Sequence, residues 1–192
     1  MIFRSGLLAA SLVAGVSLLG CGGSAEQPVS QSLPRDAYPQ GPYGISTGSV
    51  IESLDFITSE GAEFGLGEVF ADPAIRLLLL VTSAGWCTSC VEEQPVLQSL
   101  FDRYGARGLS VMVALFETGQ YKAADSNFVR YWKDKFKLSF HVVGDPAFLL
   151  SGYYDSSMTP MVMLVEVDTM KILSIQTGFD RGMVESVIEA RL

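Results

Sequence analysis

Two of the three cysteines in this 192-residue chain, Cys87 and Cys90, stand three positions apart. An apolar run, RLLLLVT at residues 76–82, ends just before them, and a helical repeat of apolar residues follows. At a helix start, the unpaired N–H groups and the helix dipole stabilise a thiolate at the first sulfur. The spacing therefore predicts a redox pair, in which Cys87 attacks and Cys90 resolves the mixed disulfide.

Two other interpretations of the pair stay open. Exported proteins often carry stabilising disulfides, although a loop this short contributes little chain-entropy stabilisation. A metal site would need two further ligands near by, and the chain has a single histidine, His141. No metal site is therefore expected. No cofactor is expected either, since the two sulfurs can carry the electrons themselves.

Alternating strand and helix patterns surround the pair. Strands are expected at 49–58, 76–82, 109–116 and 140–143, with a hairpin at 161–176. Amphipathic helices are expected at 88–104, with Gly105 as its C-terminal stop, at 124–136 and at 180–192. This order predicts an α/β fold, a three-layer sandwich with a mixed central sheet and helices on both faces.

The first 44 residues differ from the rest of the chain. Residues 7–19 are apolar or small, too short a stretch to span a bilayer but typical of a signal-peptide core. They end in Leu18-Leu19-Gly20-Cys21, which resembles the lipobox of bacterial lipoproteins and implies cleavage before Cys21 and lipidation of its sulfur. An ordinary secretory signal with a chance cysteine is the alternative. Residues 24–44 hold four of the eight prolines, as in an extended spacer.

Three segments are therefore expected. These are a lipoprotein signal peptide at 1–20, a lipidated cysteine with a Pro-rich tether at 21–44, and a folded domain at 45–192. The formal net charge is −8, from 13 basic and 21 acidic residues, and no cations cluster. Nucleic acid binding needs clustered cations, so nucleic acid is excluded as a partner.

Three further motifs accompany the cysteine pair. They are W-C-x-x-C at 86–90, its extension with Glu93 and Pro95, and Thr159-Pro160 before the expected hairpin. Together they resemble the thioredoxin superfamily, and within it the TlpA/ResA-like membrane-anchored thiol–disulfide oxidoreductases, from about Ile51 to Leu192. The sequence departs from the family pattern at Thr88-Ser89, which lacks the common proline, and at Met161, where threonine is frequent, so the direction of electron transfer stays open.

The resemblance implies a Cys87–Cys90 disulfide and a cis peptide bond before Pro160. It also implies that Trp86, Thr159 and Pro160 contact the substrate. Glu93 would exchange protons with Cys90, because Val81 occupies the position where thioredoxin has a buried aspartate. Its neighbour Glu92 is expected on the solvated face.

The implied partners are dithiols or disulfides of exported proteins, with apocytochrome c among the candidates, and an unidentified membrane electron donor or acceptor. The implied location is extracytoplasmic, on the periplasmic side of a bacterial membrane, and Gly22 after the lipidated cysteine slightly favours the outer membrane.

Three other functions on this fold remain alternatives. A copper-handling lipoprotein would use His141, Met158 and Met161 beside the cysteines. A peroxiredoxin-like enzyme is weaker, since its upstream threonine and proline would fall at Ala84 and Leu80. The third alternative is a protein that uses this fold only for binding, without turnover.

Overall fold

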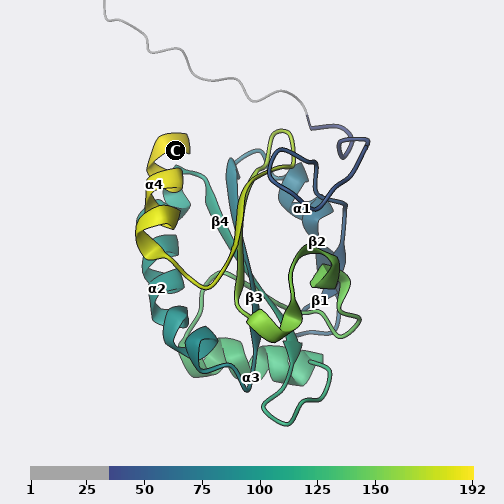
Figure 1. The fold of residues 1–192 in the computed structure, drawn as a ribbon, viewed down its shortest axis with the longest axis vertical. Helices are drawn as coiled ribbons and strands as arrows, with labels where there is room; N and C mark the ends of the chain where they lie inside the picture. The colour runs from purple at the N-terminus through teal and green to yellow at the C-terminus, as the bar shows by residue number, and fades with distance from the viewer. Residues whose placement is uncertain (1–34) are drawn as a thin grey trace, which may run out of the picture. The chain divides into compact units, whose positions relative to one another are not determined.

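The computed structural model describes residues 35–192 (Figure 1). The predicted signal peptide, the predicted lipidation site Cys21 and most of the predicted tether lie outside these residues. Within them, a seven-stranded mixed sheet has helices on both faces, which confirms the predicted α/β sandwich. None of the helices in this part of the chain is both long and apolar enough to cross a membrane.

The strand order across the sheet is β2-β1-β5-β4-β3-β6-β7. The strands are β1 (Asp55–Ile57), β2 (Glu63–Gly65), β3 (Leu77–Ala84), β4 (Leu109–Glu117), β5 (His141–Gly144), β6 (Met161–Glu166) and β7 (Lys171–Thr177). β3, β4 and β5 are parallel, whereas β6 is antiparallel to both β3 and β7. All eight residues of β3 are buried, as expected for a strand covered on both faces.

Residues 35–192 form four α-helices, which are α1 (Leu66–Ala71), α2 (Thr88–Tyr104), α3 (Ser126–Phe136) and α4 (Arg181–Arg191). Three short 3-10 helices also lie in this part of the chain, at Gly105–Arg107, Leu149–Tyr153 and Ser156–Met158. α2 has the predicted bounds. Gly105 is its C-cap residue, as predicted, although it keeps a helical φ of −55°, and the chain leaves the 3-10 turn that follows at Gly108, whose φ is 107°.

The N-terminal part of the domain departs furthest from the sequence prediction. The strand expected at 49–58 is reduced to Asp55–Ile57, and neither β2 nor α1 was predicted. A three-residue strand and a six-residue helix are too short for hydrophobic periodicity to reveal.

The pleat of β3 divides the core into two layers. Leu77, Leu79 and Val81 pack with residues from α2, α3 and α4, whereas Leu78 and Leu80 pack with α1 on the other face. The two layers hold β3 rigidly, and with it the turn that leads into α2.

Packing also begins earlier than the predicted domain start at residue 45. The Arg35 guanidinium donates hydrogen bonds to the carbonyl oxygens of Phe70, Asp72 and Ile75 and to the carboxylate of Asp168. Its side chain is only 5% exposed. Residues 35–44 of the predicted tether therefore belong to the packed domain.

Candidate redox site

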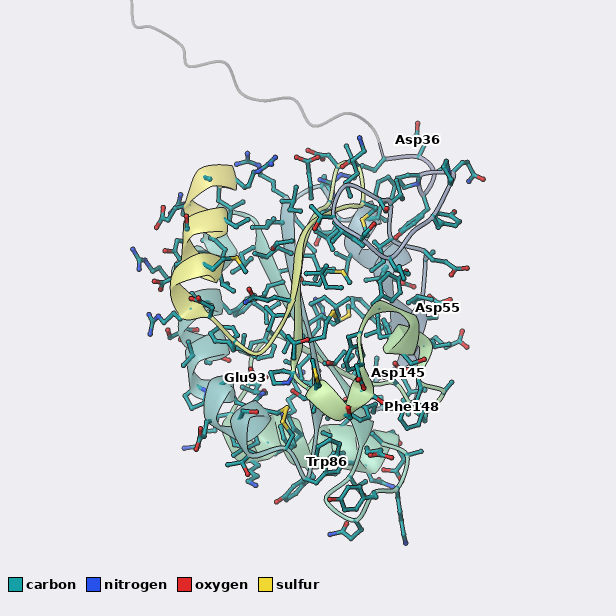
Figure 2. All side chains as sticks on the ribbon, viewed as in Figure 1. Asp36, Asp55, Trp86, Glu93, Asp145 and Phe148 are labelled. Carbon is teal, nitrogen blue, oxygen red and sulfur yellow. A yellow bond between two sulfur atoms is a disulfide. The ribbon has the colours of Figure 1, made fainter. Side chains whose placement is uncertain are left out.

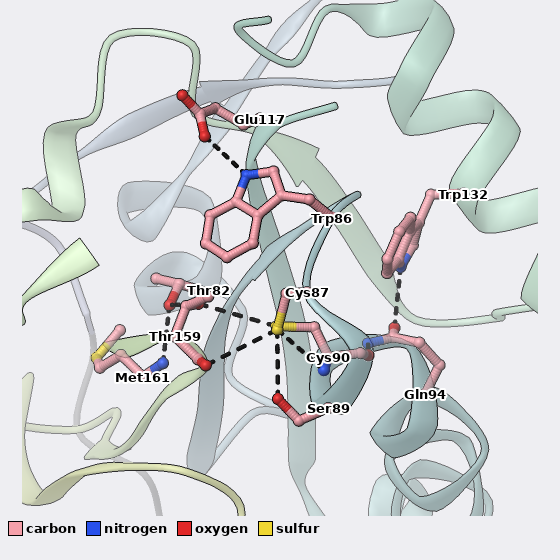
Figure 3. Close-up of a disulfide and its surroundings, with 10 residues drawn as sticks. All are labelled: Thr82, Trp86, Cys87, Ser89, Cys90, Gln94, Glu117, Trp132, Thr159 and Met161. Carbon is pink, nitrogen blue, oxygen red and sulfur yellow. Dashed lines mark hydrogen bonds between the residues drawn. A yellow bond between two sulfur atoms is a disulfide. The ribbon is translucent and has the colours of Figure 1, made fainter. Parts of the chain in front are cut away.

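A disulfide between Cys87 and Cys90 lies where β3 turns into α2, with the two Cα atoms 5.3 Å apart (Figure 3). Cys87 is the N-cap residue of α2, and its sulfur accepts a hydrogen bond from the backbone N–H of Cys90 at 3.1 Å. The Ser89 hydroxyl lies 3.4 Å from the same sulfur. The first sulfur therefore occupies the place at the helix start where donors favour a thiolate.

The two sulfurs differ in access. Cys87 is 5% exposed and Cys90 is fully buried. A hollow of about 180 Å³ is lined by Cys87 together with Gly85, Trp86, Thr88 and Val91, and Cys90 does not line it. A second polypeptide can thus approach Cys87 first, as a mechanism with an attacking and a resolving sulfur requires.

The loop before β6 faces the disulfide. Its Thr159-Pro160 peptide bond is cis. The carbonyl oxygen of Thr159 lies 3.8 Å from the Cys87 sulfur, and the Thr159 hydroxyl lies 3.9 Å from the Cys90 sulfur. The Thr82 hydroxyl of β3 accepts a hydrogen bond from the backbone N–H of Met161 at 2.9 Å and so ties this loop to the central strand. Thr82 was not identified from the sequence, although a threonine at the end of the apolar run was the available signal.

Trp86 forms one wall of the site. Its Nε1 donates a hydrogen bond to Glu117 at 2.8 Å (Figure 3). Its ring stacks on Tyr121 with a centroid separation of 5.6 Å. Its other contacts include Phe116 in an edge-to-face arrangement. Glu117 and Tyr121 fix the indole beside Cys87, and nothing in their local sequence pointed to this role.

Glu93 lies on the buried face of α2, one helical turn beyond Cys90, and is 4% exposed. Neither of its carboxyl oxygens has a hydrogen-bond partner within the described residues. Burial raises the pKa of Glu93 to about 8, and the nearby Ser83 hydroxyl of β3 lowers it by a smaller amount without a hydrogen bond of normal geometry. Glu92 is exposed and Val81 is buried, so Glu93 is the acid that faces the interior here.

The residues of the copper alternative are not brought together. His141 begins β5, two strands away from β3, where it pairs with Met112 of β4 and not with the residues at the end of β3 that lead to Cys87. Its ring stacks on Phe64 at 4.4 Å. Met158 is exposed and Met161 is buried. Across residues 35–192, no three His, Cys, Asp or Glu side chains gather closely enough to hold a metal ion.

The parallel β3–α2–β4 unit, the antiparallel β6–β7 hairpin and a Cys-x-x-Cys disulfide beside a cis-proline loop define a thioredoxin-fold protein. The comparison with solved structures agrees. A thiol:disulfide interchange protein from Bacteroides sp. matches with a TM-score of 0.60 and 17% identity, over 76% of this chain and 91% of that one.

Two further solved structures share the fold. A secreted disulfide oxidoreductase of Mycobacterium tuberculosis matches with a TM-score of 0.54 and 16% identity, over 71% of this chain and 95% of the other. The exposed lipoprotein thioredoxin of Streptococcus pneumoniae strain TIGR4 matches with a TM-score of 0.58 and 15% identity, over 72% and 99%. No protein-family model and no curated protein matches the sequence. The expected thioredoxin-like fold is therefore confirmed.

Proposed function

We propose that this protein is a thiol–disulfide oxidoreductase that acts outside the cytoplasm, anchored to a membrane through Cys21, and exchanges disulfides with exported proteins. The observation that carries the proposal is the Cys87–Cys90 disulfide at the start of α2, with Cys87 lining a hollow and Cys90 enclosed behind it. Similar folds occur in a secreted oxidoreductase and in an exposed lipoprotein, which supports the proposed location.

The reaction proceeds in two exchanges. The Cys87 thiolate attacks a client disulfide, a bond forms between Cys87 and one client sulfur, and the other client sulfur leaves as a thiolate. Cys90 then attacks the Cys87 sulfur, which closes the Cys87–Cys90 disulfide and releases the second client sulfur. Two electrons pass from the cysteine pair to the client, and the reverse sequence oxidises a client dithiol.

Hydrogen-bond donors at the start of α2 lower the free energy of the Cys87 thiolate. The Cys90 N–H already points at this sulfur, and the Ser89 hydroxyl can donate a second hydrogen bond to it. A stabilised thiolate is both the attacking form and the better leaving group. Cys87 therefore forms the mixed disulfide with the client.

Glu93 exchanges the proton of the resolving thiol. Burial raises the pKa of Glu93 to about 8, which is near the pH at which the protein works. A carboxyl group of that pKa can be present in either protonation state, so Glu93 can accept the proton of Cys90 in one direction of exchange and return it in the other.

Clients are exported proteins with an accessible cysteine pair, and apocytochrome c stays among the candidates. An extended client segment would lie against the Thr159 backbone, next to Cys87, with Trp86 on the other side of the sulfur. A membrane electron donor or acceptor would restore the pair after each turnover.

The first described residues lie away from the disulfide. Asp36 and Trp86 lie toward opposite ends of the folded domain (Figure 2). The proposed anchor at Cys21 precedes these residues, in either the inner or the outer membrane, and Gly22 slightly favours the latter.

Two measurements test the proposal. Insulin reduction by dithiothreitol should be accelerated by the protein and not by Cys87→Ala, and loss of this difference would leave a fold that only binds. Cell fractionation should find the wild type in the membrane and Cys21→Ser in the soluble extracytoplasmic fraction. A Cys21→Ser variant that stays membrane-bound would disprove the lipid anchor while leaving the redox chemistry untouched.

A further inference from the structure

A fully buried glutamine joins the resolving cysteine to a neighbouring helix. Gln94 of α2 donates a hydrogen bond from Nε2 to the carbonyl oxygen of Cys90 at 2.7 Å. Its Oε1 accepts a hydrogen bond from Trp132 Nε1 of α3 at 3.1 Å (Figure 3). A buried amide is costly unless it is bonded, and here both its oxygen and its nitrogen are. We call this arrangement the Trp132–Gln94–Cys90 bridge.

The bridge lies one residue away from a missing backbone bond of α2. In an α-helix each carbonyl accepts from the N–H four residues further on. Pro95 stands inside α2 and has no N–H, so the carbonyl of Val91 receives no such bond. The Gln94 side chain bonds to the carbonyl of Cys90, the residue just before Val91, and so adds a hydrogen bond beside the one that the helix lacks.

This contact matters most when the disulfide is open. While Cys87 and Cys90 are bonded, the bond itself fixes the second sulfur. In the mixed disulfide with a client that bond is absent, and the place of the Cys90 sulfur depends on its backbone and on the Thr159 hydroxyl 3.9 Å away. Misplacement of a reacting atom by about 1 Å can slow a reaction by about 100-fold.

We propose that Gln94 is a positioning residue, which holds the Cys90 backbone against α3 so that its sulfur remains aligned with the Cys87 mixed disulfide. The inference rests on the proposed redox function and concerns its second step. In that step the Cys90 thiolate forms a bond to the Cys87 sulfur, the bond between Cys87 and the client sulfur breaks, and the client leaves as a thiolate that takes a proton from solvent. Gln94 itself exchanges no proton or electron.

The test measures the rate at which the Cys87–Cys90 disulfide closes separately from the reactivity of the attacking Cys87 thiolate. The reduced protein is mixed with glutathione disulfide, and the release of glutathione from the Cys87 mixed disulfide is followed by rapid quenching. We expect Gln94→Met to slow this closing step by about 10-fold. The alkylation rate of Cys87 by iodoacetamide should stay within about 2-fold of the wild type, because Gln94 does not contact that sulfur.

Gln98 provides the matched control. It lies one turn further along α2, and its amide bonds to Ser139 through both ends, Nε2 to the hydroxyl at 2.8 Å and Oε1 from the backbone N–H at 2.9 Å. Gln98→Met removes these two hydrogen bonds, and the one that Nε2 donates to Asp102 at 2.7 Å, from a half-buried position of the same helix. It should lower the midpoint of unfolding without changing the closing rate, so a general loss of stability is distinguished from misplacement of Cys90.

A second variant approaches the bridge from α3. Trp132→Phe keeps an aromatic ring in the core and removes the donor to Gln94, so closure should slow by several-fold. If Gln94→Met does not fold, the closing rate of Trp132→Phe is the measurement that tests the inference. Closing rates equal to that of Gln98→Met would show that Gln94 only fills the core and would overturn the inference. If the wild type does not react with glutathione disulfide at all, the proposed redox function fails together with the inference.

Discussion

Arg35 and Asp168 are joined by two hydrogen bonds across 133 positions of sequence, from Nε at 3.1 Å and Nη2 at 2.6 Å to the same carboxylate oxygen. The same guanidinium holds three backbone carbonyls around the end of α1 and lies over the Phe70 ring at 5.8 Å. A planar group with five donors suits this task better than a lysine would. The contact fixes where the N-terminal segment enters the domain.

Arg35→Ala should therefore destabilise the domain. Three carbonyls lose a donor, and a charged-group hydrogen bond typically contributes about 1.5–3 kcal/mol, so we expect the unfolding free energy to fall by about 2 kcal/mol. Insulin reduction should be unchanged, because the disulfide lies toward the other end of the domain.

Denaturant unfolding measures the effect, and Arg107→Ala is the control. Arg107 pairs with Glu189 at 3.3 Å on the exposed surface, where an ion pair contributes little. An equal decrease in unfolding free energy for Arg35→Ala and Arg107→Ala would show that residues 35–44 do not add to the stability of the domain.

Glu93 should make the oxidised protein less stable as the pH rises. The pKa of Glu93 is about 8 in the folded chain, against an ordinary value of 4.5. Between pH 4.5 and pH 8 the folded state therefore binds more protons than the unfolded state does. The stabilisation is fully present below about pH 4.5 and is lost as the pH rises through 8. The slope approaches at most about 1.4 kcal/mol per pH unit.

Unfolding midpoints between pH 5 and 9 test this dependence, with Glu93→Gln as the comparison. The difference in unfolding midpoint between the two proteins gives the contribution of Glu93 alone. It removes the contributions of Asp145, whose pKa burial also raises, and of His141, whose pKa burial lowers. If the unfolding midpoints of wild type and Glu93→Gln changed with pH in the same way, the carboxyl group of Glu93 would have to be solvated.

The same substitution should slow disulfide exchange. Glu93→Gln keeps the shape of the side chain and removes its proton exchange, so we expect about a 10- to 100-fold loss, the lower end of what a positioned acid or base contributes. Glu92→Gln should change little, since Glu92 is exposed. Rates of thiol alkylation and of insulin reduction against pH measure both effects. Identical pH profiles for the three proteins would remove Glu93 from the chemistry.

Cys90→Ser should accumulate mixed disulfides with clients, whereas Cys87→Ser should trap few. The reason is that Cys87 lines the open hollow and Cys90 is enclosed behind it. Non-reducing electrophoresis of extracts, with mass spectrometry of the trapped species, gives the comparison and identifies the clients. Equal trapping by both variants is incompatible with separate attacking and resolving roles.

The chemistry of the site was predictable from the sequence because its signals are local. The Cys87–Cys90 spacing, the apolar run before it and the amphipathic repeat after it belong to one continuous segment, and the bounds of α2 match the prediction. The same holds for the β6–β7 hairpin. Periodicity and turn residues act over a few positions, so they can be recognised in one sequence.

The environment of that chemistry was decided by tertiary structure. Glu92 and Glu93 are adjacent and chemically identical, and only the packing of α2 on β3 exposes one and raises the pKa of the other. The ties between Thr82 and Met161 and between Gln94 and Trp132 join residues 79 and 38 positions apart. Such contacts depend on which faces of distant elements meet, and burial removes water from a group only once those faces have met.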